Sequence, residues 1–466
     1  MHVCKVREHG IGVVTLSEGS SPAWIQMMPT GDTAGVVEPA LVRRAFDAVR
    51  LQSNALRLMS TERVADRLGR LHARLLAPES TLLQTWAREV SAHNGLSEPM
   101  VEWALRDLLG RMNTRALIAL VEAEFGDRDP FGAPQMLAAH ACSRSANPPS
   151  SVFHVLAGTV PTVAVEAIVL ALLGRAPNVI KTSRNEPHVA RLYLRALRQH
   201  APDLASSVAV LTWEGGDQEL ERLACDQAAV VVAYGSNQTI DAMYGKCRFP
   251  TKFIGYGHRI SFGIVTAAGH ADRGTGPPAL SRLCRDFALD ASAFDQAGCM
   301  SMNCLFVHRA GPWTVEQIAR GLAEDEFPHV EQTLPRGRLT PNIAAAQMQA
   351  IAVAEFEGRA FVAPTGAAIA FDRCRFEPSA GGRLLNVVPY STDEELLAAL
   401  EPLRGMLSTA AIDCGNAERG ELTQRLSRMG VRRVVRPGRM QRPLWQRDHD
   451  GRPRIADWVD WTDVEP

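Results

Sequence analysis

One cysteine in this chain stands where it could act as a nucleophile. Cys299 ends the segment Asp295-Gln296-Ala297-Gly298-Cys299, which lies between an amphipathic run over 278–294 and a strand-like run over 304–307. A thiol in a glycine-loosened turn near a helix end can be held as thiolate and attack a carbonyl group. The alternative is a cysteine that packs as a small apolar residue, the commonest role of this residue type. The segment alone leaves both readings open.

The elements that would position this thiol alternate between short apolar runs and helical stretches. Strands are predicted over 152–156, 178–180, 208–211 and 229–233, and helices over 163–173, 187–200, 217–224 and 237–244. Strands separated by helices of this length are typical of right-handed crossovers in a parallel sheet. The sequence therefore predicts an α/β fold that binds ligands beyond the carboxyl ends of its strands.

The rest of the chain divides into further regions. Apolar residues at helical spacing predict that 36–125 is mainly helix, and a stretch rich in Pro, Gly, Ser and Asp over 127–149 predicts a connecting loop. A second α/β block begins near Ile260 and ends near Pro437, followed by an arginine-rich tail that contains tryptophans. We expect an amino-terminal helical and nucleotide-binding part over 1–260, a catalytic domain over 261–440 and a tail over 441–466.

Composition excludes several classes of protein. The 466 residues are 46% hydrophobic with a formal net charge of -1, which gives no electrostatic footprint for nucleic acid or a membrane surface. Nine cysteines without regular spacing argue for a reducing compartment, and no Cys/His cluster has zinc-ligand spacing. No signal-peptide region and no apolar stretch of membrane-spanning length is found. We expect a soluble cytoplasmic protein with no metal.

Seven short motifs are spread along nearly the whole chain. The Asp-Gln-x-x-Cys segment at Cys299 is one of them. The others are Gly95-Leu96-Ser97-Glu98-Pro99-Met100-Val101, Gly158-Thr159-Val160-Pro161-Thr162, Asn178-Val179-Ile180-Lys181-Thr182-Ser183-Arg184, Tyr256-Gly257-His258-Arg259, Phe376-Glu377-Pro378-Ser379 and His449-Asp450-Gly451-Arg452. In these motifs and their order the chain resembles the LuxC-type acyl-CoA reductases, a branch of the aldehyde dehydrogenase superfamily.

The resemblance implies an aldehyde dehydrogenase-like fold, with two parallel-sheet α/β domains and an amino-terminal helical region. It also implies reduction of an acyl thioester to an aldehyde through an acyl-Cys299 intermediate. The thioester would be carried by CoA or an acyl-carrier protein, an acyl-transfer protein would be a partner, and the enzyme would be a homo-oligomer.

Thr159 departs from the superfamily pattern. The matching position usually holds an asparagine whose amide joins the backbone N–H of the nucleophile in binding the oxyanion. A threonine hydroxyl can donate one hydrogen bond over a shorter reach, and loss of such a donor commonly costs about 3 kcal/mol. The alternative is that Thr159 only caps the helix that follows.

Resemblance also assigns a cofactor site. Lys181 falls where the superfamily has its ribose-binding lysine, and Ser183 and Arg184 follow it. NAD-preferring relatives tend to have glutamate at the position of Arg184, whose charge would instead attract a 2′-phosphate, so NADPH is favoured over NADH. Gly235 and Ser236 could bind the pyrophosphate at a helix N-terminus, or Ser236 could be an ordinary N-cap.

The remaining candidates are weaker. Glu377 is expected to touch the cofactor ribose, or else to be a solvated surface residue. Gly255 lies where hydrolytic aldehyde dehydrogenases have the glutamate that activates water, so the base for release of a free acid is missing. His258 could act as an acid or base, but a structural hydrogen bond is the commoner role.

Other residues are read as structural. Four cysteines sit within helical or strand patterns and are expected to pack: Cys225, Cys247, Cys284 and Cys304. The tail with Trp445, His449, Asp450, Trp458 and Trp461 is expected to be structural. The arginines Arg432, Arg433, Arg436, Arg439 and Arg442 could form a basic rim for a phosphate or an acidic carrier protein, or simply a solvated face.

The sequence thus favours an NADPH-dependent acyl-thioester reductase with Cys299 as nucleophile and Thr159 as a second oxyanion donor. Two alternatives remain: an aldehyde dehydrogenase that works in the oxidative direction, and a superfamily member that has lost catalysis and serves as an assembly or binding subunit.

Overall fold

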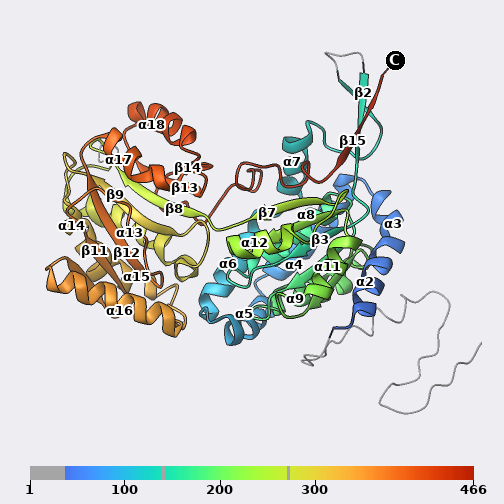
Figure 1. Cartoon of the computed structure of the whole chain (residues 1–466), viewed down its shortest axis with the longest axis horizontal. Helices are drawn as coiled ribbons and strands as arrows, with labels where there is room; N and C mark the ends of the chain where they lie inside the picture. Colours follow the sequence, from blue (N-terminus) through green and yellow to red (C-terminus); the bar gives the residue numbers. More distant parts are fainter. Residues whose placement is uncertain (1–36, 138–141, 270–272, 466) are drawn as a thin grey trace, which may run out of the picture. The chain divides into compact units, whose positions relative to one another are not determined.

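The computed structural model describes residues 37–137, 142–269 and 273–465. The amino-terminal stretch that was searched for a signal peptide lies outside these residues. Residues from Glu38 onward belong to one unit, which contains three sheets. The labels of Figure 1 give the places of the helices and strands named below. No helix among the described residues is long and apolar enough to cross a membrane.

The predicted helical region is present between Pro39 and Phe125. Its helices are α2 (Pro39–Leu51), α3 (Ser53–Arg57), α4 (Thr61–Leu76), α5 (Leu82–Asn94), α6 (Glu98–Arg111) and α7 (Thr114–Phe125). The junction of α5 and α6 follows from its sequence. Gly95 ends α5 with a φ of 83°, and the Ser97 hydroxyl caps α6 by accepting a hydrogen bond from the Met100 backbone N–H.

Five parallel strands follow in the order β5-β4-β3-β6-β7. They are β3 (Val152–Val155), β4 (Asn178–Thr182), β5 (Val208–Thr212), β6 (Val230–Tyr234) and β7 (Lys252–Tyr256), joined through α8 (Thr162–Leu173), α9 (His188–His200), α10 (Pro202–Ala205), α11 (Gln218–Gln227) and α12 (Asn237–Tyr244). The four strands and four helices predicted from periodicity are confirmed. The strand order reverses at β3 and β6, which places the ligand-binding crevice at the carboxyl ends of these two strands.

The second sheet has seven strands in the order β10-β11-β12-β9-β8-β13-β14. They are β8 (Ile260–Val265), β9 (Met302–His308), β10 (Ala360–Ala363), β11 (Gly366–Ala370), β12 (Leu384–Tyr390), β13 (Leu407–Asp413) and β14 (Arg433–Val435). Its helices are α13 (Pro277–Ser292), α14 (Val315–Arg320), α15 (Phe327–Glu331), α16 (Pro341–Phe356), α17 (Asp393–Leu400) and α18 (Asn416–Arg428). Three short helical segments accompany them: η1 (Ala293–Gln296), η2 (Gly321–Glu326) and η3 (Glu401–Leu403).

In this sheet only the β10–β11 pair is antiparallel. The Cys299 segment lies between α13 and β9, as the sequence predicts.

The connecting loop predicted over 127–149 is wrong in part. This stretch contains β1 (Gln135–Leu137) and β2 (Cys142–Asn147), and β2 pairs with β15 (Asp460–Val464) at the other end of the chain (Figure 1). The strands are polar and largely solvent-accessible, so they carry little apolar alternation. Their pairing over a long sequence separation leaves no local signal.

The carboxyl-terminal segment returns from β14 to the helical region and the five-stranded sheet. Trp445 and Trp458 are buried there. The Glu124 carboxylate accepts hydrogen bonds from the backbone N–H groups of Arg454, Ile455 and Ala456 at 2.8, 2.7 and 2.8 Å. Since the residues just before this anchor lie beside Cys299, Glu124 helps to place part of the candidate site.

Replacing this anchor should destabilise the protein. Glu124→Ala leaves three backbone N–H groups without their acceptor, so we expect a loss of about 2 kcal/mol or more in unfolding free energy. The matched control is Glu122→Ala on the exposed side of the same helix, which should change stability by less than about 0.5 kcal/mol. Urea unfolding of both variants checks this, and equal stability of the two would contradict it.

Candidate active site

The turn that leads to Cys299 has an uncommon backbone. Phe294, Asp295 and Gln296 have φ values of 55°, 48° and 63°, so three consecutive residues other than glycine lie in the left-handed region. Each such residue costs roughly 1 kcal/mol, and in this run the cost must be offset by contacts around the turn. The Asp-Gln pair of the motif therefore has a structural role.

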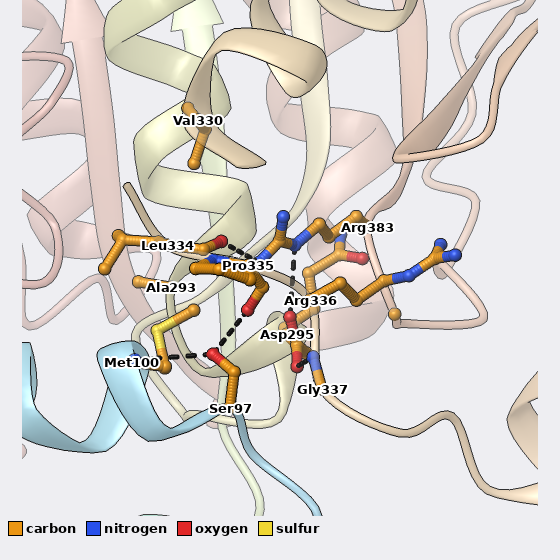
Figure 2. Close-up of polar contacts among 12 residues, drawn as sticks. Ser97, Met100, Ala293, Asp295, Val330, Leu334, Pro335, Arg336, Gly337 and Arg383 are labelled. Carbon is orange, nitrogen blue, oxygen red and sulfur yellow. Dashed lines mark hydrogen bonds and ion pairs between the residues drawn. The ribbon is translucent and has the colours of Figure 1, made fainter. Parts of the chain in front are cut away.

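Asp295 is held by contacts from three sides (Figure 2). Its carboxylate accepts hydrogen bonds from the Gly337 backbone N–H at 2.9 Å and from Arg383 Nε at 3.1 Å, and its carbonyl accepts one from the Gly382 N–H at 3.0 Å. Burial raises the pKa of Asp295, while Arg383 and the Gly337 N–H act in the opposite direction. The carboxylate thus has a cation and a backbone donor to compensate for its loss of water.

Arg383 is the centre of this network. Its side chain is fully buried, and it also donates to Glu331 Oε2 and to the Leu334 carbonyl, both at 2.6 Å. The adjacent Gln296 side chain continues the support: it accepts from the Leu384 N–H at 3.0 Å and donates to the Met302 carbonyl at 3.0 Å. The turn is thereby fixed to β9 and β12.

The helical region docks onto the same turn through the Gly95–Val101 motif. Ser97 Oγ donates to the Pro335 carbonyl at 2.5 Å (Figure 2). The Phe294 N–H approaches Met100 Sδ at 3.4 Å. A Cβ atom at Gly337 would lie 2.2 Å from the Gly95 carbonyl oxygen, so this approach requires glycine. The motif that resembles a family signature is a docking element between α5, α6 and the turn.

Cys299 follows the turn and is exposed. Its carbonyl accepts a hydrogen bond from Ser261 Oγ at 2.7 Å, and Ser261, at the start of β8, is itself fully buried. Within the part of the chain that the structure describes, the Cys299 backbone N–H has no acceptor. This N–H is therefore available to a developing oxyanion.

The thiol faces a pocket of about 220 Å³. Its wall contains Met300, Ser408, Thr409, Arg432 and Arg433, together with residues 447–451 of the carboxyl-terminal segment. The packed protein around the thiol raises the pKa of Cys299 to about 11, with Asp450 and Glu166 adding to the rise and Arg447 and Arg433 opposing it. Formation of the thiolate thus depends on the balance of charges in this wall.

Thr159 lies in a loop that touches the nucleophile turn. A Cβ atom at Gly298 would lie 3.7 Å from Val160 Cγ2, so the loop after β3 and the residue before Cys299 are neighbours. Thr159 itself is exposed. The role of Thr159 as an oxyanion donor remains a prediction, and the closeness of the next residue, Val160, to Gly298 is compatible with it.

The residues predicted to bind the cofactor lie at the carboxyl edge of the five-stranded sheet. Lys181 is the last residue but one of β4 and is buried. Its ammonium lies 5.9 Å from the centre of the Trp213 ring and 3.7 Å from where a Cβ of Gly215 would be. Burial lowers the pKa of Lys181. Within the described residues it forms no ion pair, which leaves the ammonium free for a ligand hydroxyl.

The neighbours of Lys181 make different contacts. Ser183 Oγ lies 2.6 Å from where a Cβ of Gly158 would be, so this glycine is needed where the loops after β3 and β4 meet. Arg184 has a 64% exposed side chain and pairs with Glu214 at 3.3 Å. The sequence reading missed Glu214, because it follows a different strand.

Gly235 and Ser236 connect β6 to α12. The Ser236 hydroxyl accepts from the Thr239 N–H, so the N-cap interpretation is confirmed, and α12 begins directly after the carboxyl end of β6. Glu377 lies between β11 and β12, where its carboxylate is 3.3 Å from Arg375 Nε. Contact of either segment with a cofactor remains a prediction.

The histidine beside Cys299 is His449. His258 is exposed, and its backbone N–H donates to Asn237 Oδ1. His449 lines the pocket and stacks on the Tyr256 ring at 4.2 Å. Burial and three arginines hold the pKa of His449 well below its ordinary value. The expectation that the tail is only structural was therefore incomplete.

Two further expectations need adjustment. Arg432 and Arg433 line the Cys299 pocket, so the arginine cluster is not only a solvated face. Cys225, Cys284 and Cys304 are buried as predicted, but Cys247 is only half-buried and lies just beyond α12. No group of three or more potential metal-binding side chains occurs among the residues described.

Comparison with known proteins decides the family. The model of the family described as Acyl-CoA reductase (LuxC) matches residues 56–461. The chain belongs to the LuxC acyl-CoA reductase family. Two curated relatives are long-chain acyl-protein thioester reductases: that of Aliivibrio fischeri is 24% identical over 230 residues, 48% of this chain and 45% of that protein, and that of Photorhabdus laumondii is 25% identical over the same shares. These matches thus span just under half the length of either relative.

Solved structures show the fold of this LuxC family member. An aldehyde dehydrogenase from Brucella melitensis biovar abortus 2308 aligns with a TM-score of 0.68 at 12% identity, covering 92% of this chain and 89% of that one. Aldehyde dehydrogenase 21 from Physcomitrella patens aligns with a TM-score of 0.70 at 12% identity, covering 92% and 90%. The predicted aldehyde dehydrogenase-like fold is confirmed.

The Arg383 network generates a direct test. Arg383→Gln leaves the Asp295 and Glu331 carboxylates without their shared cation, so we expect a loss of about 3 kcal/mol in stability and slower alkylation of Cys299. The matched control is Arg373→Gln, at an exposed arginine that lies, like Arg383, between β11 and β12. Denaturant unfolding and iodoacetamide labelling measure the two effects, and a fully stable Arg383→Gln protein would refute the assigned role.

Proposed function

We propose that this LuxC family member reduces an acyl thioester to an aldehyde, with NADPH as reductant and Cys299 as the acyl-carrying nucleophile. The proposal rests mainly on the position of Cys299. This exposed residue follows a turn that is held by many hydrogen bonds, and it lines a pocket. The pocket lies beside the carboxyl edge of the five-stranded parallel sheet, the type of sheet that binds nucleotides. The names of the curated relatives, which act on acyl-protein thioesters, support the same reaction class.

The edge of the five-stranded sheet fits a nicotinamide dinucleotide. Lys181 offers an uncompensated ammonium, Gly215 leaves space beside it, and α12 presents N–H groups after Gly235. Lys181, Ser183 and Arg184 would hold the adenosine ribose and its 2′-phosphate, and Gly235 and Ser236 the pyrophosphate. Glu377 would contact the second ribose. A bound reduced nicotinamide would supply the hydride that adds to the carbonyl carbon of acyl-Cys299, and cleavage of the carbon–sulfur bond would then release the aldehyde and return the Cys299 thiolate.

The chain's own residues perform the acyl transfer. The Cys299 thiolate attacks the thioester carbonyl carbon, a new carbon–sulfur bond forms, and the carbonyl oxygen takes up negative charge. The free Cys299 N–H, and Thr159 where its hydroxyl reaches, stabilise that oxygen. Collapse of the intermediate expels the thiolate of CoA or a carrier protein and leaves acyl-Cys299.

Hydrolysis of acyl-Cys299 lacks its usual base. A Cβ atom at Gly255 would lie 2.5 Å from Ile240 Cγ2, so the position of the superfamily's water-activating glutamate has no room for a side chain without rearrangement. The absence of that carboxylate favours the reductase over an oxidative enzyme.

The oxidative aldehyde dehydrogenase is the second candidate because of His449. This imidazole lines the Cys299 pocket, and its lowered pKa keeps it neutral at physiological pH, the form that can accept a proton from water. Formation of free acid from an aldehyde, lost in His449→Asn, would favour this candidate.

The nucleophile is tested by Cys299→Ala. We expect this variant to lose aldehyde formation from acyl-CoA while it binds NADPH with unchanged affinity, because the thiol belongs to the acyl-transfer step alone. NADPH absorbance and aldehyde trapping measure the first effect, and fluorescence titration the second. Cys374→Ala, at a half-buried cysteine of the same sheet region, should retain activity. Substantial turnover by Cys299→Ala would refute the assignment.

Cofactor choice is tested at the Arg184–Glu214 pair. Arg184→Glu should weaken NADPH binding by about tenfold or more relative to NADH, because repulsion replaces attraction to the 2′-phosphate. Glu214→Gln should have the opposite effect, since it frees the guanidinium. Arg222→Glu, at an exposed arginine of α11, is a control for the same charge change. Equal losses for both nucleotides in Arg184→Glu would show that Arg184 does not read the phosphate.

A further inference from the structure

Two arginines of the Cys299 pocket lack carboxylate partners. Among the described residues, neither Arg433 nor Arg447 forms a salt bridge, whereas the nearby Arg259 and Arg454 each pair with a carboxylate. Arg433 donates to Thr409 Oγ1 at 3.2 Å and to the carbonyls of Arg439 and Met440. Arg447 donates to the carbonyl of Asp448 at 2.8 Å, while its buried Nε has no partner. Neutral acceptors satisfy hydrogen bonds but leave the charges uncompensated.

Both guanidinium groups converge on the residue that follows the nucleophile. Arg433 Nη2 lies 3.5 Å from Met300 Sδ, and Arg447 Nη2 lies 4.0 Å from the same sulfur. Met300 and Cys299 line one pocket with both arginines. An anion at the Cys299 thiol would therefore lie against two positive charges.

The carboxylates around the thiol do not form ion pairs with Arg433 or Arg447 in the described part of the chain. Glu166 on α8 binds Arg454 at 2.6 Å, and Asp450 binds Arg259 at 3.0 Å. Asp290 lies near Arg433, but its two carboxyl oxygens accept hydrogen bonds from the backbone N–H groups of Gly438 and Met440, and burial raises the pKa of Asp290 to about 8. Three other charged or titratable groups line the pocket: Arg432, Asp448 and His449. Asp448 is exposed to solvent, and the lowered pKa of His449 keeps its imidazole neutral.

We propose that Arg447 and Arg433 are the counter-ions of the Cys299 thiolate. On ionisation the S–H bond breaks, the proton leaves to solvent and the electron pair stays on sulfur, where the two guanidinium groups stabilise it. Loss of water in the packed wall disfavours that anion, and the two arginines offset part of this effect. The inference deepens the proposed function, on which it rests for the use of the thiolate in acyl transfer.

The test measures the thiolate directly, without thioester or nucleotide. Iodoacetamide reacts with the thiolate, so its rate at Cys299, followed by peptide mass spectrometry from neutral to alkaline pH, reports the ionised fraction. Loss of a nearby cation raises the pKa of a thiol, so Arg447→Gln and Arg433→Gln should each slow alkylation at neutral pH by about tenfold. Arg447→Lys should retain most of the rate.

A variant of opposite sign separates electrostatics from damage to the fold. Asp450 has a φ of 51°, which asparagine tolerates, so Asp450→Asn removes a negative charge with little strain. It should speed alkylation of Cys299. Cys374, whose pKa burial raises to about 11, is the internal control in the same molecules and should keep its rate throughout. Arg442→Gln, at an arginine that pairs with Asp107, should leave both rates unchanged.

Slower alkylation in the arginine variants with faster alkylation in Asp450→Asn supports the proposal. Unchanged Cys299 rates in Arg447→Gln and Arg433→Gln, or the same direction of change in the arginine variants and Asp450→Asn, would overturn it. Failure of thioester reduction with an intact alkylation pattern would refute the proposed function alone.

Discussion

The left-handed turn from Phe294 to Gln296 is the constraint on which the rest of the site depends. Three consecutive non-glycine residues hold positive φ values there, and a free chain would relax out of them. The buried Arg383 prevents this through Asp295, and the Gln296 side chain prevents it through β9 and β12. The direction in which the Cys299 thiol points is thus set by hydrogen bonds that lie behind it.

The pocket in front of the turn is assembled from segments far apart in sequence. Ser261 of β8 fixes the Cys299 carbonyl, the loop after β3 touches Gly298, and residues 447–451 close the wall. Glu124 on α7 anchors the chain just after this last segment. The site is therefore built from the helical region, both large sheets and the carboxyl-terminal tail. This explains why the family motifs are spread over almost the whole chain.

The sequence predicts those features of the fold that depend on residues close together in the chain. Apolar periodicity identified the elements of the five-stranded sheet. The turn before Cys299 left two interpretations of this cysteine open, and its choice as nucleophile, which rests on the resemblance to the family, stays a prediction. Local pattern does not encode pairing across long separations, so the β2–β15 pair was missed, as were the Arg383–Asp295 and Arg184–Glu214 contacts. His449 was read as structural for the same reason: only folding brings it beside Cys299, whereas His258 is nearer in sequence and lies exposed.

The proposed reaction requires that Cys299 carries the acyl group and that no positioned base hydrolyses it. Intact-protein mass spectrometry with peptide mapping, after acyl-CoA is added and NADPH is withheld, tests both requirements. We expect a stable mass increase of one acyl group on Cys299, which added thiols remove and which Cys299→Ala abolishes. Acylation at another residue, or rapid release of free acid from Cys299 without added thiol, would contradict it.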